Sequence, residues 1–161
     1  MDFSIPQPLK AEHNEFHEEL VRATQAGGDT GAAAATVAKL LHPHFLKEEE
    51  YALPPLGLLA RIAARGDNFT GVDDAVAMAE RLKSELPQML AEHQEIVRAL
   101  GNLVTAARAE GHAEYARFAE KLILHARTEE EVLYPAAILL GEYLKLRQEA
   151  ERQGGKPAEA G

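Results

Sequence analysis

Apolar side chains recur at helical spacing through most of the chain. In four long stretches they fall three or four residues apart, which is the spacing of one face of an α-helix. The predicted helices cover residues 8–26, 30–53, 72–108 and 113–146. No segment alternates apolar and polar residues with the period of a strand, so we predict an all-α fold.

The connections between the predicted helices are short, and residues 56–65 predict a short connector helix. Short connections favour an up-down-up-down four-helix bundle. Three prolines fall inside the helical pattern. Because proline lacks a backbone N–H, we expect a kink or local widening at Pro43, a kink at Pro87 and a bend at Pro135.

The length and composition fit a single soluble domain. The chain has 161 residues, of which 46% are hydrophobic, so residues 1–150 suffice for one bundle with a buried core. Residues 151–161 are Gly, Pro, Ala and charged side chains, and predict a disordered tail. The net charge of -9 argues against nucleic acid or an anionic membrane as partner. The absence of cysteine excludes disulfides, iron–sulfur clusters and thiolate zinc sites.

The chain also lacks the usual sequence signals for export. Residues 1–8 contain neither the basic segment nor the apolar run of a signal peptide. No uninterrupted apolar stretch approaches the roughly 20 residues that span a bilayer. We therefore expect a cytoplasmic protein.

The sequence contains an internal repeat that relates its two halves. The segment Ala-Glu-His-Asn-Glu at residues 11–15 returns as Ala-Glu-His-Gln-Glu at residues 91–95. A His-x-x-x-Glu-Glu-Glu segment at residues 44–50 returns at residues 125–131. The two histidines of a half are 31 residues apart in the first half and 32 in the second. The bundle is therefore expected to consist of two helical hairpins of like design.

The side chains shared by the two halves are candidate metal ligands: His13, His44, Glu48, His93, His125 and Glu129. His17 lies one turn after His13 and is a seventh candidate. An isolated buried carboxylate is unfavourable unless it is paired or binds a metal. We therefore expect Glu48 and Glu129 to point inward, and the glutamates that follow them to point mostly to solvent: Glu49, Glu50, Glu130 and Glu131.

The donor set selects among metals. Five imidazoles and two carboxylates are too rich in nitrogen for calcium or magnesium, and too many for one tetrahedral zinc. Imidazole with carboxylate suits iron, manganese or another first-row metal, and a dinuclear centre would use all seven side chains. A ferritin-like site is disfavoured, because it uses Glu-x-x-His with the glutamate first.

Other polar and aromatic residues carry weaker expectations. His42 precedes Pro43 and lies on a different face from His44, which favours solvent or packing. His112 belongs to a turn and is expected to be exposed. Tyr51 lies three residues after Glu48, so it either hydrogen-bonds to the centre or packs as an ordinary core tyrosine.

The order His, His-x-x-x-Glu, His, His-x-x-x-Glu on four helices resembles the hemerythrin-like (HHE) cation-binding family. The resemblance covers about residues 8–146. It implies a non-heme di-iron centre in the bundle core, with the four repeated histidines as ligands and Glu48 and Glu129 bridging. Manganese or zinc are possible substitutes for the two iron ions.

Two features differ from the oxygen-carrying hemerythrins. Those proteins place a His-x-x-x-His pair on the third helix, whereas here Val97 lies four residues after His93. They also use an aspartate five residues after the last histidine; here Glu129 lies at four, with Glu130 at five as the alternative bridge. The pattern is closer to the bacterial and iron-sensing members.

The resemblance implies a protein that binds or senses O2, NO or another small oxidant at a His/Glu-ligated metal pair. Two alternatives remain open: a di-iron enzyme acting on peroxide or O2, and an iron-responsive or iron-handling protein. The expected partner is thus a small diatomic ligand or peroxide. The sequence leaves the oligomeric state open, and it contains no phosphate loop that would favour a kinase.

Overall fold

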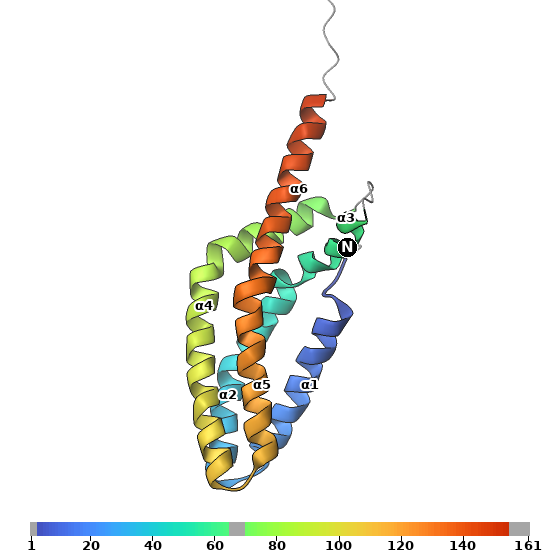
Figure 1. The fold of residues 1–161 in the computed structure, drawn as a ribbon. Coiled ribbons are helices and arrows are strands. Elements are labelled where there is room, and N and C mark those ends of the chain that lie inside the picture. The colour runs from blue at the N-terminus through green and yellow to red at the C-terminus, as the bar shows by residue number, and fades with distance from the viewer. Residues whose placement is uncertain (1–2, 65–69, 155–161) are drawn as a thin grey trace, which may run out of the picture.

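The computed structural model describes residues 3–64 and 70–154, and within these ranges the chain is helical and contains no strand (Figure 1). The α-helices are α1 (Gln7–Thr24), α2 (Gly28–Lys47), α3 (Leu59–Ala63), α4 (Val72–Ala109), α5 (Ala113–Thr128) and α6 (Tyr134–Gly154). Shorter helical segments are η1 (Glu48–Ala52), η2 (Pro54–Leu58) and η3 (Glu129–Leu133). The prediction of an all-α helical bundle is confirmed. None of the described helices has the length and hydropathy needed to cross a bilayer.

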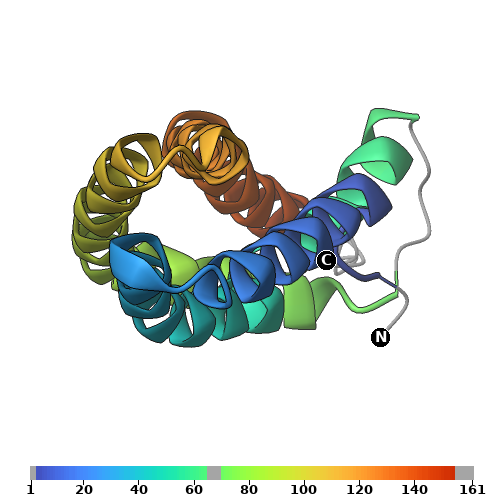
Figure 2. The same ribbon diagram turned by 90° about the horizontal axis from the view of Figure 1, so that it is seen from below.

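The turn between α1 and α2 and the turn between α4 and α5 lie at the same end of the bundle (Figures 1 and 2). A contact between these two turns caps the N-terminus of α2. The helix α2 begins at Gly28, and the carboxylate of Glu110 accepts hydrogen bonds from the backbone N–H groups of Asp29 (2.8 Å) and Thr30 (2.9 Å). The Thr30 hydroxyl donates to the same carboxylate. A carboxylate at a helix N-terminus accepts from N–H groups that have no partner within the helix, and its negative charge is stabilised by the positive end of the helix dipole.

Two π-helical turns, η1 and η3, interrupt the long helices at equivalent places of the repeat. In each, the N–H of the fifth following residue bonds to the carbonyl of a glutamate, Glu48 or Glu129. A proline, Pro54 or Pro135, comes directly after that donor. Because a proline ring clashes with the carbonyl four residues earlier in an α-helix, the wider π turn accommodates it.

The widening expected at Pro43 does not occur. There, α2 continues through the proline as an α-helix. The carbonyl that lost its donor there belongs to Lys39, and both residues are exposed. Water can hydrate that carbonyl, so the helix is not forced open. Figure 1 shows α4 bending in its N-terminal part, and Pro87 lies inside this helix, as the sequence predicted.

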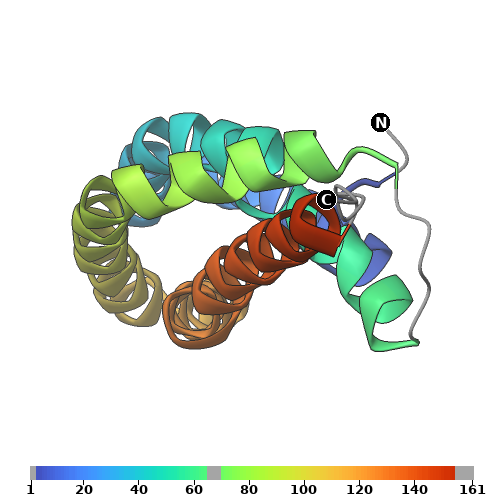
Figure 3. The same cartoon turned by 90° about the horizontal axis from the view of Figure 1, so that it is seen from above.

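The connector predicted at residues 56–65 consists of η2 and α3, which stand to one side of the long helices (Figure 3); residue 65 lies outside the described residues. The last helix is longer than predicted. It continues to Gly154, so residues 151–154 of the expected tail are helical, and residues 155–161 lie outside the described residues. A methyl group at Gly141 would lie 2.4 Å from the Cβ of Ala79, so glycine permits close packing of α6 on α4.

The core consists of apolar layers with a polar layer between them. One layer, near the two turns, includes Phe16, Leu41, Leu100 and Leu122. A second layer, towards the connector, includes Tyr51, Leu53, Leu82, Met89 and Tyr134. On each long helix the repeated histidine falls between residues of these two layers. The fold thus places the polar side chains in a position that excludes water.

Candidate metal centre

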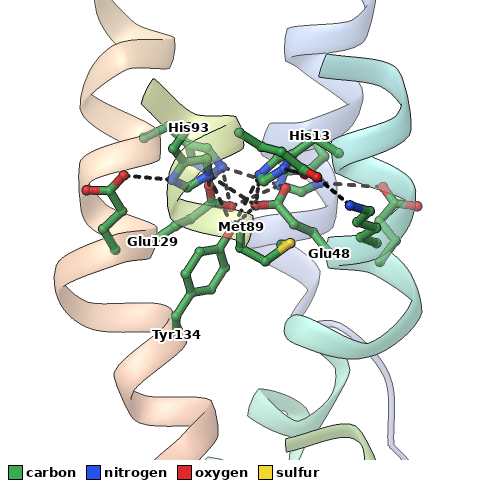
Figure 4. A network of polar contacts seen from close by, with 12 residues as sticks. His13, Glu48, Met89, His93, Glu129 and Tyr134 are labelled. Carbon is green, nitrogen blue, oxygen red and sulfur yellow. Dashed lines mark hydrogen bonds and ion pairs between the residues drawn. The ribbon is translucent and has the colours of Figure 1, made fainter. Parts of the chain in front are cut away.

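Histidines from four helices meet at one level of the bundle (Figure 4). The six side chains that converge there are His13 on α1, His44 on α2, His93 on α4, His125 on α5, and Glu48 and Glu129, which begin η1 and η3. Each histidine exposes at most 5% of its surface, and Glu48 and Glu129 expose 0% and 1%. Burial of so many polar groups is costly unless they bind one another or a cation.

One group of three potential ligands consists of His44, Glu48 and His93. Oε1 of Glu48 lies 3.0 Å from Nε2 of His44 and 3.6 Å from Nε2 of His93. Nitrogen and oxygen donors that share one first-row ion at about 2.1 Å lie roughly 3 Å apart. The three donor atoms therefore already have nearly the separation that a common ion requires.

The second group consists of His13, His125 and Glu129. Oε1 of Glu129 lies 2.9 Å from Nε2 of His125 and 3.5 Å from Nε2 of His13. The groups face each other: Oε2 of Glu129 lies 3.4 Å from Nε2 of His93, and Oε2 of Glu48 lies 3.7 Å from Nε2 of His13. Each carboxylate thus presents one oxygen to its own group and the other oxygen to the opposite group.

Carboxylates outside the centre hold the other nitrogen of three of the four histidines, those of His44, His93 and His125. Nδ1 of His44 lies 2.8 Å from Oε2 of Glu92, and Nδ1 of His125 lies 3.0 Å from Oε2 of Glu12. Burial alone would raise the pKa of Glu92, but hydrogen bonds from His44 and other neighbours lower it to about 2. A carboxylate that accepts from Nδ1 leaves Nε2 free to face the centre and raises its basicity.

The same arrangement corrects part of the sequence interpretation. Nδ1 of His93 lies 3.0 Å from Oε1 of Glu130, and Nδ1 of His13 lies 3.5 Å from Oε1 of Glu49. Glu49 and Glu130 are half-buried and contact histidines, although we expected them to face solvent. The glutamates that follow them, Glu50 and Glu131, are exposed as expected. The four outer carboxylates repeat between the halves, as the histidines do.

Two carboxylate oxygens at the centre lack hydrogen-bond donors. Among the described residues, the buried side-chain atoms without a hydrogen-bond partner include Oε2 of Glu48 and Oε1 of Glu129. The 2.9 Å contact from His125 to Glu129 is close but lacks the direction of a hydrogen bond. The nitrogen and oxygen atoms of the centre thus lie close together without being aligned for hydrogen bonds, as atoms that coordinate one ion do. This geometry fits a metal ion.

The electrostatics of the metal-free centre favour cations. Burial would lower the pKa of His93, but hydrogen bonds and charges from Glu129 and Glu48 outweigh it and raise the pKa to about 10. The pKa values of His44 and His125 are raised in the same way, against burial, by their own His-x-x-x-Glu partners. Burial opposes ionisation of Glu129, yet its three histidine partners hold its pKa well below the ordinary value. The same carboxylate charges that favour imidazolium would favour a metal cation.

Tyr134 is a member of the centre that the sequence did not reveal. Its hydroxyl donates to Oε1 of Glu48 and lies 3.3 Å from Nε2 of His44 and 3.1 Å from Nε2 of His93. Figure 4 shows its ring reaching the centre from the connector side, beside Met89. Burial, with the charges of Glu48 and Glu129, raises the pKa of Tyr134 above its ordinary value, so the phenol keeps its proton. The second group has no such hydroxyl among its printed contacts, so the centre is asymmetric.

The candidate Tyr51 is buried but directs its hydroxyl away from the centre. It donates to Oε2 of Glu85 (2.7 Å) and lies beneath the guanidinium of Arg81, 4.1 Å from the ring centroid. The alternative of an ordinary core tyrosine therefore describes Tyr51 better. Since η1 carries one extra residue in its turn, a side chain three residues after Glu48 no longer shares the direction of Glu48.

His17 does not join either group of ligands. It is exposed on α1, because it is rotated about 80° from the centre of the buried face at 100° per residue. With His42, also exposed, it lines a cavity of about 300 Å³ between α1 and α2. The same cavity is lined by His13 and Glu49, so it adjoins the centre.

Comparison with known families agrees with this geometry. A family model described as the hemerythrin HHE cation binding domain matches residues 8–137, a range that includes all six converging side chains and Tyr134. No curated protein and no solved structure matches the chain.

Proposed function

The chain belongs to the hemerythrin HHE cation-binding domain family, and from this premise we propose that it binds a pair of iron ions and uses them to bind or sense a small oxidant such as O2 or NO. The observation that supports this most is the pair of buried ligand groups, each with two imidazoles and one carboxylate. Manganese or zinc would suit the same donors. The expected setting is the cytoplasm.

The roles of the residues follow from their contacts. His44 and His93 would hold one ion, and His13 and His125 the other. Glu48 and Glu129 would bridge, since each faces both groups. Two imidazoles and two carboxylate oxygens would face each ion, and this set would leave room for a small ligand. The outer carboxylates fix the tautomers of His44, His93 and His125, and apolar layers cover the site from both ends of the bundle.

The test is anaerobic loading with ferrous iron, a metal count after desalting, and absorption spectra on adding O2, NO and peroxide. We expect an iron content of about two per chain and a spectral change with at least one of the small oxidants. A reversible O2 or NO adduct supports binding or sensing. An iron content well below one per chain contradicts the proposal.

One observation favours a second candidate, an oxidoreductase acting on peroxide. The hydroxyl of Tyr134 is a buried hydrogen-bond donor within reach of one ligand group. Because this phenol keeps its proton, it would act as a hydrogen-bond donor to a bound oxidant, and loss of one such donor typically costs about 10²–10³ in rate. An iron-handling role remains a third candidate, which iron affinity measurements address.

Replacing Tyr134 separates binding from turnover. In Tyr134→Phe the ring still fills its place in the core, but the hydrogen-bond donor is lost. We expect unchanged iron content, and a fall of about a hundredfold or more in peroxide consumption if the protein is an enzyme. Tyr51→Phe is the matched control, because the Tyr51 hydroxyl contacts Glu85 instead of the centre. Equal activities of Tyr134→Phe and the unsubstituted chain would exclude the phenol as hydrogen-bond donor in the reaction.

A second variant tests the remaining ligand candidate. Because His17 is exposed and outside both ligand groups, we expect His17→Ala to bind as much iron as the unsubstituted chain, with the same spectrum. Metal analysis and absorption spectroscopy measure this directly. Loss of one iron per chain in His17→Ala would restore His17 to the ligand set.

A further inference from the structure

The helix α6 has two apolar faces instead of one. Its buried face packs on the bundle through Tyr134, Ala137, Leu140, Gly141 and Leu144. A second set of large apolar side chains is exposed: Leu139 by 68%, Tyr143 by 44% and Leu146 by 65% on α6, and Val132 by 56% just before it in η3. A helix that belongs only to its own bundle normally carries charged residues on the face away from the core.

The exposed apolar residues follow a regular spacing. Together with two alanines, they recur at alternating steps of four and three residues, which is the a/d pattern of a coiled coil. We call this set the α6 seam, and its members are Val132, Ala136, Leu139, Tyr143, Leu146 and Ala150. In heptad terms Val132, Leu139 and Leu146 take d positions, and the others take a positions. Scattered surface hydrophobic residues would not keep this register over more than two heptads.

Most of the α6 seam is accessible to a partner, and only Ala136 is partly covered, where it packs against the second apolar layer. At 100° per residue it lies about 140° around the helix from the buried face, so the bundle leaves most of it uncovered. Figure 1 shows α6 extending beyond the other long helices. Upstream, Leu124 on α5 is also exposed, by 64%. The extra residue of the π turn η3 brings it into register with Val132, so the apolar face spans about 40 Å at 1.5 Å per residue.

We propose that the α6 seam binds the same seam of a second copy of this chain, with the two helices parallel in a two-fold symmetric dimer. A straight helix with an a/d seam is complementary to itself, which is the requirement for an isologous interface. This proposal is independent of the metal centre, whose ligands come from one chain.

The charges beside the seam select the parallel orientation. Glu142 and Glu149 lie at g positions and Arg147 lies at an e position. In a parallel pair the g residue of one helix meets the e residue five positions later on the other, so Glu142 faces Arg147 of the second copy, twice by symmetry. In an antiparallel pair g positions face g positions, and the glutamates would repel one another. Within its own chain, one oxygen of Glu142 lies 2.8 Å from Lys83 and 3.6 Å from Lys145, and Arg147 lies 3.7 Å from Glu151, so the contact across the dimer would add to these pairs.

Sedimentation velocity of the full chain over a range of concentrations tests the dimer. We expect a concentration-dependent dimer for the unsubstituted chain. In L139E/L146E the dissociation constant should rise by at least about a hundredfold, because apolar side chains leave the interface and four carboxylates enter it. The matched control is Leu46→Glu, because Leu46 is 57% exposed on α2 outside the seam. It should dimerise like the unsubstituted chain, and all variants should keep the same helical circular dichroism and iron content.

Two outcomes of that experiment overturn the proposal. One is an unsubstituted chain that stays monomeric at every concentration. If that monomer floats with lipid vesicles in a separate flotation experiment, the seam is a membrane-binding face instead. The other is a dimer that L139E/L146E leaves intact, which would place the interface elsewhere.

Orientation is tested by cross-linking, because the chain contains no cysteine. In a parallel dimer each d residue lies beside its own copy, so Leu139→Cys and Leu146→Cys should both give disulfide-linked dimers on mild oxidation. Leu46→Cys should stay monomeric on a non-reducing gel. An antiparallel dimer brings at most one of these d positions beside its copy. Cross-linking of only one of the two seam variants therefore contradicts the parallel arrangement.

Discussion

Replacing His44 and His125 together with alanine is expected to abolish stable iron binding. The double variant removes one imidazole from each ligand group. It also leaves the outer carboxylates Glu92 and Glu12 without the nitrogen they hold. Loss of an outer partner alone typically lowers metal affinity 10–100-fold, and loss of a direct ligand should lower it by at least about a hundredfold at each ion. Iron content after desalting should fall to a small fraction of that in the unsubstituted chain.

The control for this result removes two imidazoles that lie outside the centre. His42 is exposed, and His112 is the N-cap residue of α5 at the far turn, half-buried where exposure was expected. H42A/H112A should therefore retain full iron content. Circular dichroism must show that both double variants are folded. Unchanged iron uptake by folded H44A/H125A would refute the assignment of the ligands, because neither group could then depend on its His-x-x-x-Glu pair.

The second large effect concerns the metal-free chain, whose stability is expected to fall as the pH rises from about 6.5 to about 10. In the folded chain the pKa of His93 is raised from 6.5 to about 10 by Glu129 and Glu48. A raised pKa means that the folded state binds the proton more tightly than the unfolded state does. The stabilisation is complete below pH 6.5 and is lost as the pH approaches 10, by an amount on the order of a few kcal/mol. Urea unfolding of the metal-free chain at several pH values measures it.

Iron loading should remove most of this dependence, because metal ions replace the protons between the carboxylates. His42→Ala serves as the control, since an exposed histidine should leave the pH profile of the metal-free chain unchanged. A free energy of unfolding of the metal-free chain that stays constant or increases between pH 6.5 and 10 would contradict this electrostatic account. Protonation of His93 would then not stabilise the folded state.

The internal repeat made much of the fold and of the site predictable. Helical spacing of apolar residues marked the long helices, because each must bury one face. The repeat then singled out His13 and His93, which would be unremarkable alone, and distinguished Glu129 from the two glutamates beside it. These inferences work from sequence because each depends on local spacing along one helix.

Contacts between helices were less predictable. The glutamates that hold the histidine Nδ1 atoms come from neighbouring helices, and only packing shows that Glu92 meets His44 and Glu130 meets His93. Their repetition next to the histidines was a signal that could have suggested them. Likewise, His17 lies one helical turn after His13. The centre of the buried face of α1 is rotated away from His17, so this side chain is exposed and lies outside the centre.

The sequence by itself thus determined the helices, the two-hairpin repeat and the six ligand candidates. Only the tertiary structure decided that Tyr134 reaches the centre, five residues after Glu129, while Tyr51 turns away from it. The physical reason is the extra residue in each π turn, which shifts every later side chain around the helix by about 100°. That shift turns Tyr134 towards Glu48, and it also brings Leu124 into line with the α6 seam. A periodic pattern read at 3.6 residues per turn cannot anticipate a change in the period itself.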